Sequence, residues 1–485
     1  MAPVRQIARI AREEAGTILV FWALMLAALM GLVALSFDIG RIASTQSELQ
    51  SFADSVALAA AGELDGSDEA IARAGRAAEG LVTRDQTFAA GERLLSGPVD
   101  YTLTFYPTLP PDDRTAMTGA TTDPNRARYV RAVVTPRDVA TPFAAALRVL
   151  TGGAAGGPAQ VGAEAVAGFT MYACDITPLM FCVPGGWRAN ENRGQMILLR
   201  SGGNGAAWGP GNFGFLDPEK NAVDPNGPCA GLNGVQLDAC LVSAEGSVTQ
   251  CFRQDGVDTE PGQKVGIQDA IFNVRFDIYQ SIMNNKRNSP IYRPAPNVVK
   301  GVVPKGGGKC VGNNADPSPN TMAMPRDSAF TDRFGNGEWD SAGYVATNHN
   351  GADPTSAHGF GAAHPLSGTR YEMYSAEIAA AGAGNILPAG KAETGIAQCT
   401  QAGPSPDPDR RVLIAAAIDC DANPINGRET GVPVQEFVRI FMTEPVGNSG
   451  TNSVDLFVEV LGSAGGGAGG GGVEGAFHEV VQLYR

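Results

Sequence analysis

The apolar positions of the chain are concentrated in one uninterrupted run near the N-terminus, Thr17–Phe37, with the sequence TILVFWALMLAALMGLVALSF. This run is 21 residues long and contains no charged side chain. A helix of that length rises about 30 Å, which matches the hydrocarbon thickness of a bilayer. Because a helix satisfies its backbone hydrogen bonds internally, the pattern predicts a single transmembrane helix over residues 17–37.

Basic residues flank this run unevenly, since Arg5, Arg9 and Arg12 precede it and only Arg41 follows closely. Positively charged flanks tend to stay on the cytoplasmic side of a membrane. The pattern therefore predicts a cytoplasmic basic tail at residues 1–16 and export of everything after the helix.

Two other interpretations of the run compete with a membrane anchor. A cleaved signal peptide would use Ala34 and Ser36 as its small-residue cleavage site, but the apolar core of a signal peptide usually spans only about 7–15 residues. A buried core helix is the other alternative, although such helices rarely lack charge over so many turns. The length of the run favours the uncleaved anchor.

Beyond the run, apolar side chains recur three or four positions apart, as on one face of a helix. They are Ile39, Ile42, Leu49, Phe52, Ala53, Val56, Ala57, Ala60 and Leu64. The helix is predicted to continue to about Leu64, roughly 75 Å in all, before Gly62 and Gly66 end it. This alanine-rich stripe could pack on the chain's own domain or on other helices of a filament or complex.

Residues 38–170 combine helical and alternating patterns, which indicates a small N-terminal α+β domain. Ser67 is expected to cap a second helix that reaches about Leu81. The other predicted elements are strands at Tyr101–Tyr106, Tyr129–Thr135 and Val161–Phe169, a helix at Pro142–Leu150 and a glycine-rich joint at Thr151–Ala159.

Residues 171–485 are rich in Gly, Pro, Asn and Asp, which indicates a β-rich domain with long loops. The predicted strands are Gln195–Arg200, Arg411–Asp419, Val434–Thr443, Val454–Leu461 and His478–Tyr484, and the predicted helices are Gln268–Asn285 and Arg370–Ala381. Gly462–Gly472 indicates a linker or hairpin loop. The predicted fold class is thus α+β: a single N-terminal transmembrane helix continuing into a long exported helix, followed by antiparallel or mixed sheets with disulfide-held loops.

All eight cysteines lie after the apolar run, in the part that is predicted to be exported. They are Cys174, Cys182, Cys229, Cys240, Cys251, Cys310, Cys399 and Cys420. An even number of cysteines outside the cytoplasm indicates disulfides, and the absence of a CxxC pair argues against a zinc knuckle or a redox motif. Cys174 with Cys182, the nearest local pair, is the expected first bridge, and sequence alone leaves the other connectivities open.

Composition and motifs argue against several classes of function. The net charge is −14 and the sequence pI is about 4.8, whereas nucleic-acid binding requires a basic face. The Gly306–Lys309 run is too short for a phosphate-binding loop, and no GxSxG elbow occurs. His478 and Glu479 begin an HExxH pattern, but Gln482 stands at the position of the second histidine. The chain is therefore predicted to be no enzyme and to need no cofactor.

Three histidines, His349, His358 and His364, cluster in one stretch with Asp340 and Asp353 nearby. They could hold a metal ion, but their spacing matches no zinc pattern, and a solvated loop is the simpler interpretation. No catalytic, cofactor-binding or metal-ligating residue is assigned.

Two segments, 65–69 and 316–320, begin like the DxSxS metal-adhesion signature and lack its second serine. That signature needs two hydroxyls and a carboxylate converging on one cation, so neither segment predicts a metal-dependent adhesion site.

The N-terminal motifs resemble those of the TadG-like family of Flp (Tad) pilus-assembly proteins. The resemblance rests on Gly16 before the apolar run, on Asp38–Arg41 (DIGR) behind it, on Leu49–Gln50, and on the alanine-rich block Ala53–Ala61. Further segments at 210–217, 274–279, 333–340 and 370–378 resemble the exported part of long TadG-like chains. Some members of the family carry a von Willebrand A domain, whose DxSxS signature is incomplete in this sequence.

The resemblance implies a bitopic protein of the bacterial inner membrane, with a cytoplasmic N-terminus and a periplasmic C-terminal domain. Its expected partners are the lipid bilayer and other pilus-assembly proteins, and its expected role is structural and non-catalytic. Two alternatives stay open: an exported adhesin-like binding module, and an exported hydrolase with an unrecognised site.

Processing as a pilin is not expected. Prepilin peptidases cut after a glycine, and the fifth residue of the mature pilin is typically glutamate; here Phe21 stands five residues after Gly16. The anchor is therefore predicted to remain intact.

Overall fold

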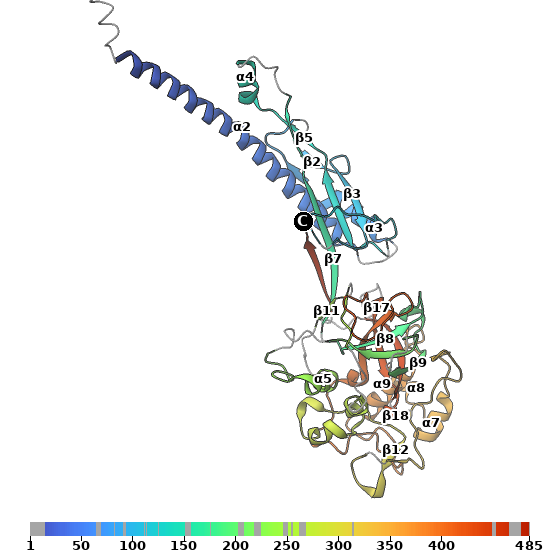
Figure 1. Ribbon diagram of the computed structural model, residues 1–485. Helices are drawn as coiled ribbons and strands as arrows, with labels where there is room; N and C mark the ends of the chain where they lie inside the picture. Colours follow the sequence, from blue (N-terminus) through green and yellow to red (C-terminus); the bar gives the residue numbers. More distant parts are fainter. Residues whose placement is uncertain are drawn as a thin grey trace, which may run out of the picture. The chain divides into compact units, whose positions relative to one another are not determined.

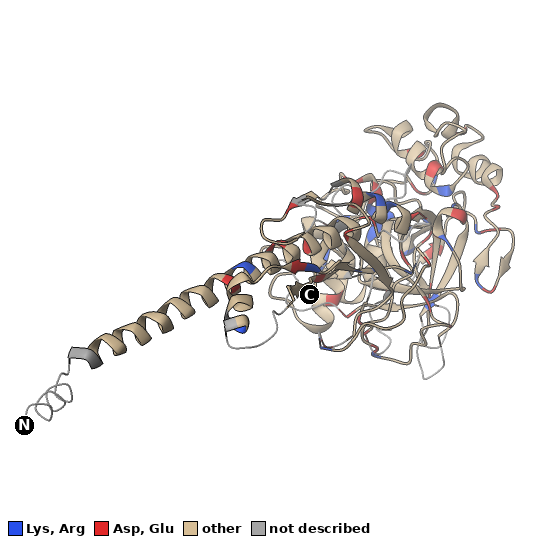
Figure 2. Cartoon of the chain, turned by 90° about the horizontal axis from the view of Figure 1, so that it is seen from above, with Lys and Arg blue, Asp and Glu red and all other residues tan. Residues whose placement is uncertain are grey.

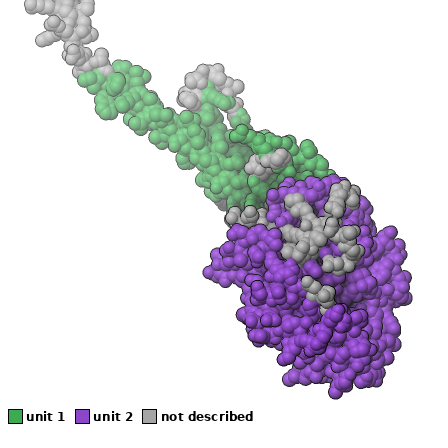
Figure 3. Space-filling view, turned by 60° about the horizontal axis from the view of Figure 1, so that its bottom comes forward, with its two compact units in different colours: residues 1–170, 479–485 green, residues 171–478 purple. Residues whose placement is uncertain are grey.

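The computed structural model describes residues 15–64, 69–81, 83–90, 94–110, 112, 114–124, 126–150, 157–174, 176–201, 208–217, 225–245, 251–253, 256–260, 268–312, 315–448, 453–464 and 477–484. The basic tail, the Ser67 cap and most of the two glycine-rich segments predicted above lie outside the described residues. The chain divides into two compact units, one of residues 1–170 and 479–485 and one of residues 171–478, coloured separately in Figure 3.

The first unit is organised on one long helix, α2, Ala15–Ala61, which Figure 1 shows without a break. Its 47 residues rise about 70 Å. The helix ends at Ala61, and the next residue, Gly62, donates its backbone N–H to the carbonyl of Leu58. The predicted end of the helix at Gly62 is therefore confirmed, three residues before the expected Leu64. The long apolar N-terminal helix predicted from the hydrophobic pattern is thus present.

A sheet and a second helix cover the C-terminal half of α2. The helix α3, Ala70–Leu81, packs on α2, and so does the central strand β4 of the sheet. The sheet has the antiparallel order β7-β4-β3, with Tyr101 opposite Val134 and Tyr129 opposite Gly168. Its strands are β3 Tyr101–Tyr106, β4 Tyr129–Val134 and β7 Glu164–Cys174, and the smaller elements are β1 Thr83–Asp85, β2 Leu94–Ser96, β5 Arg137–Val139, β6 Ala159–Val161 and α4 Pro142–Leu150.

The terminal strand β20, Phe477–Leu483, also pairs with β7, although the sequence grouped it with the domain of residues 171–485. Tyr484 donates its backbone N–H to Val166, and its ring packs edge-on against Tyr129 at 5.4 Å. Gly168 makes room for both rings, since a Cβ at this position would lie 2.5 Å from Tyr129. The period-2 pattern predicts that this segment is a strand, but it says nothing of the partner.

The second unit contains a sheet of mixed direction that closes on itself. Its strands follow the order β14-β15-β9-β10-β8-β16-β17-β19-β18, and an additional pairing joins β9 to β19. Six of these strands therefore form a closed, barrel-like ring, which removes the exposed sheet edges. The strands are β8 Leu179–Val183, β9 Met196–Ser201, β10 Asn212–Phe215, β14 Phe330–Thr331, β15 Phe334–Gly335, β16 Val412–Asp419, β17 Glu436–Met442, β18 Gly447–Asn448 and β19 Val454–Ser463.

Short helices and strands surround this ring, and one hydrophobic cluster draws side chains from all six of its strands and from α5 and α6. The helices are α5 Gly234–Ser243, α6 Gln268–Asn273, α7 Ser341–His349, α8 Thr355–His358 and α9 Arg370–Ala381. The 3-10 turns are η1 Ala189–Glu191, η2 Val274–Phe276, η3 Ser281–Lys286, η4 Pro290–Tyr292, η5 Lys305–Gly307 and η6 Pro408–Arg411. The remaining strands are β11 Cys251–Arg253, β12 Val302–Pro304 and β13 Ala315–Pro317.

The helix predicted over Gln268–Asn285 is wrong beyond Asn273. The side-chain amide of Asn273 donates to the carbonyl of Val446 and accepts from its N–H, at 3.0 and 2.7 Å. Asp277 then takes a left-handed conformation with φ of 62°. Tertiary hydrogen bonds outweigh a local pattern that continues the helix.

The eight cysteines form four disulfides, Cys174–Cys251, Cys182–Cys420, Cys229–Cys240 and Cys310–Cys399. The bridge expected between Cys174 and Cys182 is wrong. Strand pairing decides the partners, because Cys174 on β7 lies directly opposite Cys251 on β11. Cys182 belongs to β8, and its partner follows the neighbouring strand β16.

Removing the long-range bridge should destabilise the second unit more than removing the local one. Cys182 and Cys420 are 238 residues apart in sequence, and Cys229 and Cys240 are 11 apart. Chain-entropy estimates give about 5 kcal/mol for the first bridge and about 3 kcal/mol for the second. Guanidinium unfolding of the two double Cys→Ala variants measures the difference, and equal losses of stability would contradict it.

Candidate functional site

The most conspicuous chemical surface of the molecule is the N-terminal half of α2. Its large apolar side chains from Ile18 to Phe37 are between 45% and 73% exposed. In Figure 2 this part of the helix carries neither blue nor red residues, because the first charged residues after the apolar run are Asp38 and Arg41. Among the described residues, this is the one helix long and apolar enough to cross a membrane.

This surface is far larger than the apolar patches that soluble proteins leave in water, and a lipid bilayer is the solvent that suits it. The alternative of a buried core helix does not hold, because the most apolar window of α2 has no buried residue. The surface can therefore serve as a membrane anchor, and it offers no group for catalysis.

The end of the apolar surface is tied to the first unit through Asp38. This side chain is 2% exposed, and its Oδ2 atom accepts the backbone N–H of Ala144 at 2.7 Å. Ala144 lies in the first turn of α4, where backbone N–H groups lack partners within the helix and favour a negative charge. Next to Asp38, the rings of Phe37 and Phe143 pack edge to face at 5.6 Å.

The stripe predicted on the second half of α2 is buried within its own unit. Leu49, Phe52 and Val56 have no exposed surface, and neither do the alanines between and after them, Ala53, Ala57 and Ala60. Small side chains let α3 approach closely, through Ala70, Ala74 and Ala78, which are also fully buried. Packing on the chain's own domain is therefore confirmed for these residues. Ile39 differs, since it is 55% exposed.

Another face of α2 stays open and consists of small and polar residues. A shallow hollow there is lined by Ala43, Gln46, Ser47, Gln50, Ser51 and Asp54. Gln50 donates to Asp54 at 2.8 Å and to the carbonyl of Glu164 at 3.0 Å. The prediction that the stripe packs on other helices of an assembly concerned different residues, of which Ile39 is exposed, and it stays a prediction.

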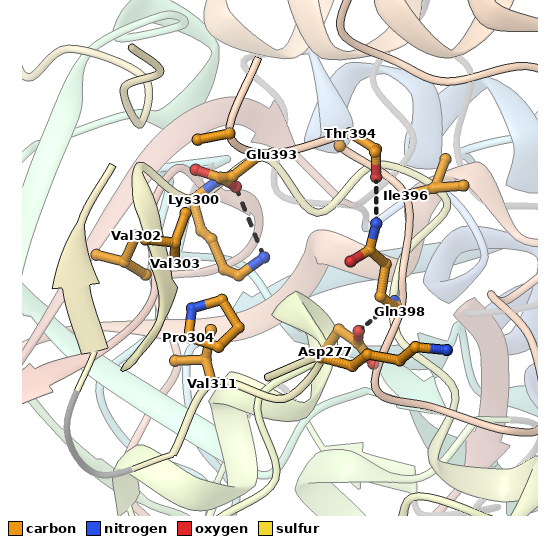
Figure 4. Close-up of a pocket in the computed structure, with 13 residues that line it drawn as sticks. Asp277, Lys300, Val302, Val303, Pro304, Val311, Glu393, Thr394, Ile396 and Gln398 are labelled. Carbon is orange, nitrogen blue, oxygen red and sulfur yellow. Dashed lines mark hydrogen bonds and ion pairs between the residues drawn. The ribbon is translucent and has the colours of Figure 1, made fainter. Parts of the chain in front are cut away.

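The second unit contains a small polar pocket beside Asp277, drawn in Figure 4. Its volume is about 30 Å³, well below the roughly 300–1,000 Å³ of ordinary small-molecule sites. The Asp277 carboxylate accepts the backbone N–H groups of Gln398, Cys399 and Thr400 at 2.6 to 2.9 Å. Burial raises the pKa of Asp277 above its ordinary value, although these three hydrogen bonds oppose the shift.

The opposite wall of this pocket is an ion pair. The Nζ atom of Lys300 lies 3.6 Å from Oε2 of Glu393, which also accepts the backbone N–H of Lys300. The other oxygen of Glu393 accepts the hydroxyl of Thr321 at 2.8 Å. These carboxylates hold loops around the Cys310–Cys399 bridge.

The three histidines do not converge. His349 is buried on α7, and its Nε2 atom lies 2.7 Å from Glu377, whereas His358 is exposed on α8. His364 accepts the backbone N–H of Leu366 and packs on Phe360. The two nearby carboxylates cap local turns, Asp340 at Gly343 and Asp353 at Thr355. No three His, Cys, Asp or Glu side chains in the described part of the chain are placed to share a metal ion.

The segments that begin like the HExxH and DxSxS motifs do not form metal sites among the described residues. Residues 478–482 belong to strand β20, which does not present two side chains as a metal-binding helix does. Asp316 lies in the exposed edge strand β13, and Ser318 accepts the backbone N–H of Thr321. Residues 65–68 of the other segment are outside the described residues.

Sequence reasoning missed a buried charge cluster at the start of α9. Arg370 has no exposed side-chain surface and bonds Glu459 at 3.0 Å and Asp327 at 2.5 Å. Burial raises the pKa of the Glu459 carboxyl, while Arg370 opposes the shift. Arg370 is the first residue of the RYEMYSAEI segment. The local sequence does not indicate its two partners, Asp327 and Glu459, which lie 43 and 89 residues away.

These features define a class of protein: a single apolar helix long enough to span a membrane, carrying an α+β unit built on that helix and a disulfide-bonded, barrel-containing unit. Within this class, residues 16–63 match the Tad family model, described as "Putative Flp pilus-assembly TadE/G-like". The resemblance found in the N-terminal motifs is thereby confirmed over these residues. The further resemblances between 210 and 378 stay predictions.

Two other comparisons found nothing. No curated protein matches the chain, and no solved structure matches it.

Enlarging a buried alanine of α2 should destabilise the first unit. Ala57→Leu is expected to cost about 1–3 kcal/mol, because the added methyl groups have no space between α2 and its neighbours. Ala43→Leu is the matched control, since Ala43 is exposed on the same helix. Hydrogen exchange of the β4 peptides, followed by mass spectrometry, should accelerate several-fold in the first variant only. Unchanged exchange in Ala57→Leu would show that the stripe is not a core.

Proposed function

We propose that this protein is a structural or assembly component of a Flp/Tad-type pilus system, held in the inner membrane as a bitopic protein. The match of residues 16–63 to the Tad family carries the proposal. The exposed apolar surface of α2 supports it, because the matched residues include the whole of the apolar run and most of the buried stripe.

The proposed orientation places residues 1–16 in the cytoplasm and the rest of the chain in the periplasm. The three arginines before the run and the single one close behind it support this direction. The four disulfides support it independently, since disulfides persist in the periplasm and are rare in the bacterial cytoplasm.

The chain is proposed to keep its anchor and to remain outside the filament shaft. A mature pilin carries a carboxylate near its new N-terminus, whereas Phe21 occupies this position after Gly16 and no acidic residue occurs in Thr17–Phe37. A charge inside lipid is costly and is kept only for a purpose, so its absence supports a role as a plain anchor.

The role is proposed to be non-catalytic. The pocket beside Asp277 supports this, because its carboxylates are occupied by backbone N–H groups and by Lys300. The buried histidine, His349, is likewise engaged with Glu377.

Loss of the gene should abolish surface pili in a strain that assembles Flp-type pili. Pili counted by electron microscopy should return with the full-length chain and not with a Leu26→Arg variant, which places a charge at the centre of the span. A Val99→Arg variant is the control, since Val99 is 80% exposed on the first unit. Normal pili with reduced adhesion in the deletion strain would instead support an adhesin, and normal pili with normal adhesion would overturn the proposal.

Topology can be measured with alkaline phosphatase fused after Arg485 and an epitope tag at the N-terminus. Fusion at the end of the chain keeps β20 in the sheet of the first unit. The expected product has high phosphatase activity and stays in the membrane with its tag intact. An inactive phosphatase would contradict the orientation, and a mature chain that begins at Thr17 would move the protein to the pilins.

A further inference from the structure

The short helix α4 exposes an apolar face that nothing in the described part of the chain covers. Phe143 is 44% exposed and Val149 is 59% exposed, and Pro142 and Ala146 are exposed as well. At about 100° per residue these four positions fall within roughly a third of the helix circumference. They therefore form one face, which is called the α4 apolar face below.

This face is continuous with the lipid-facing surface of α2. The rings of Phe37 and Phe143 are in contact at 5.6 Å, and both side chains remain about half exposed. Phe37 is the last residue of the 21-residue apolar run, so α4 lies at the level where α2 would leave the bilayer. Figure 1 shows α4 beside α2 within the first unit.

The position of α4 is fixed by a buried contact. Asp38, the first charged residue after the run, is 2% exposed and accepts the N–H of Ala144 at 2.7 Å. A carboxylate at a helix N-terminus stabilises that helix in this orientation. The charge is thereby withdrawn from the membrane boundary and used to hold α4 against α2.

The composition of α4 suits the interface between lipid and water. Its sequence PFAAALRVL has one ionisable residue, Arg148, and no acidic residue. Interfacial helices place an apolar face in the boundary between the headgroups and the acyl chains.

We propose that α4 is a second membrane contact, an interfacial helix whose apolar face lies in the outer boundary of the same bilayer that α2 crosses. The occupant of the face is phospholipid. Two contacts, one spanning and one interfacial, hold the first unit against the membrane surface and limit its tilt relative to that surface. This inference rests on the proposed membrane span.

Photocrosslinking of the full-length chain tests the inference. The protein, with p-benzoylphenylalanine at position 143 or 149, is placed in nanodiscs of phosphatidylethanolamine and phosphatidylglycerol and irradiated. Mass spectrometry of the α4 peptide should detect phospholipid adducts at both positions, at several-fold higher yield than at position 99. Val99 is the matched control, because it is an exposed apolar residue before β3, whose first residue packs on Phe52 and not on the membrane end of α2.

A fourth probe at position 26 separates this inference from the proposed span. Lipid adducts at 26 without adducts at 143 and 149 would overturn the interfacial helix and leave the anchor intact. The absence of adducts at 26 would overturn the anchor itself and the inference with it. Cross-links from 143 or 149 to a second copy of the chain would also overturn the inference, since the face would then be a protein interface.

Discussion

The rest of the structure depends on the continuity of α2, because one unbroken helix carries both the exposed apolar surface and the core of the first unit. In lipid, the backbone has no alternative to helical hydrogen bonds, so the first half of α2 must be helical. The second half is the core of the first unit, where Leu49, Phe52 and Val56 are fully buried. Since α2 has no proline in its 47 residues, the direction of its apolar half and the orientation of the first unit are coupled.

The chain enters the second unit from β7 and returns from it into β20, and these two strands pair with each other. The second unit is therefore an insertion into the first, bounded by two adjacent strands. The return is secured by Tyr484 packing on Tyr129 over Gly168, a position where a side chain has no space. Removal of the last residues should then weaken the first unit, even though they follow the second one in sequence.

The hydrophobic pattern predicted a helix or strand correctly where the residues that stabilise the element belong to the element itself. The bounds predicted for β3, α4 and α9 coincide with those observed, and those of α2 and of the ring strands β9, β16, β17 and β19 differ by a few residues. The other two ring strands, β8 and β10, were not predicted. Prediction from the sequence failed where a distant partner decides the outcome. The helical turns that begin with α6 end at the left-handed Asp277, whose carboxylate binds the distant backbone of Gln398 and Thr400, and Cys174 pairs with Cys251 because β11 lies beside β7. The closure of the ring between β9 and β19 depends on strands more than 250 residues apart.

The same distinction between local and distant contacts applies to the candidate site. The long apolar helix could be predicted because its uncharged run of 21 residues is visible in the local sequence, whereas the role of Asp38 depends on Ala144, 106 residues later. In the second unit, buried charges such as Arg370 and Asp277 are bound by partners that join separate loops. Leaving either group unpaired would cost several kcal/mol, about half the stability of an ordinary domain, so these contacts select one arrangement of the long loops. Polar groups committed in this way are not free for chemistry. The geometry of the loop surface of the second unit therefore depends on the buried charges and the disulfides together.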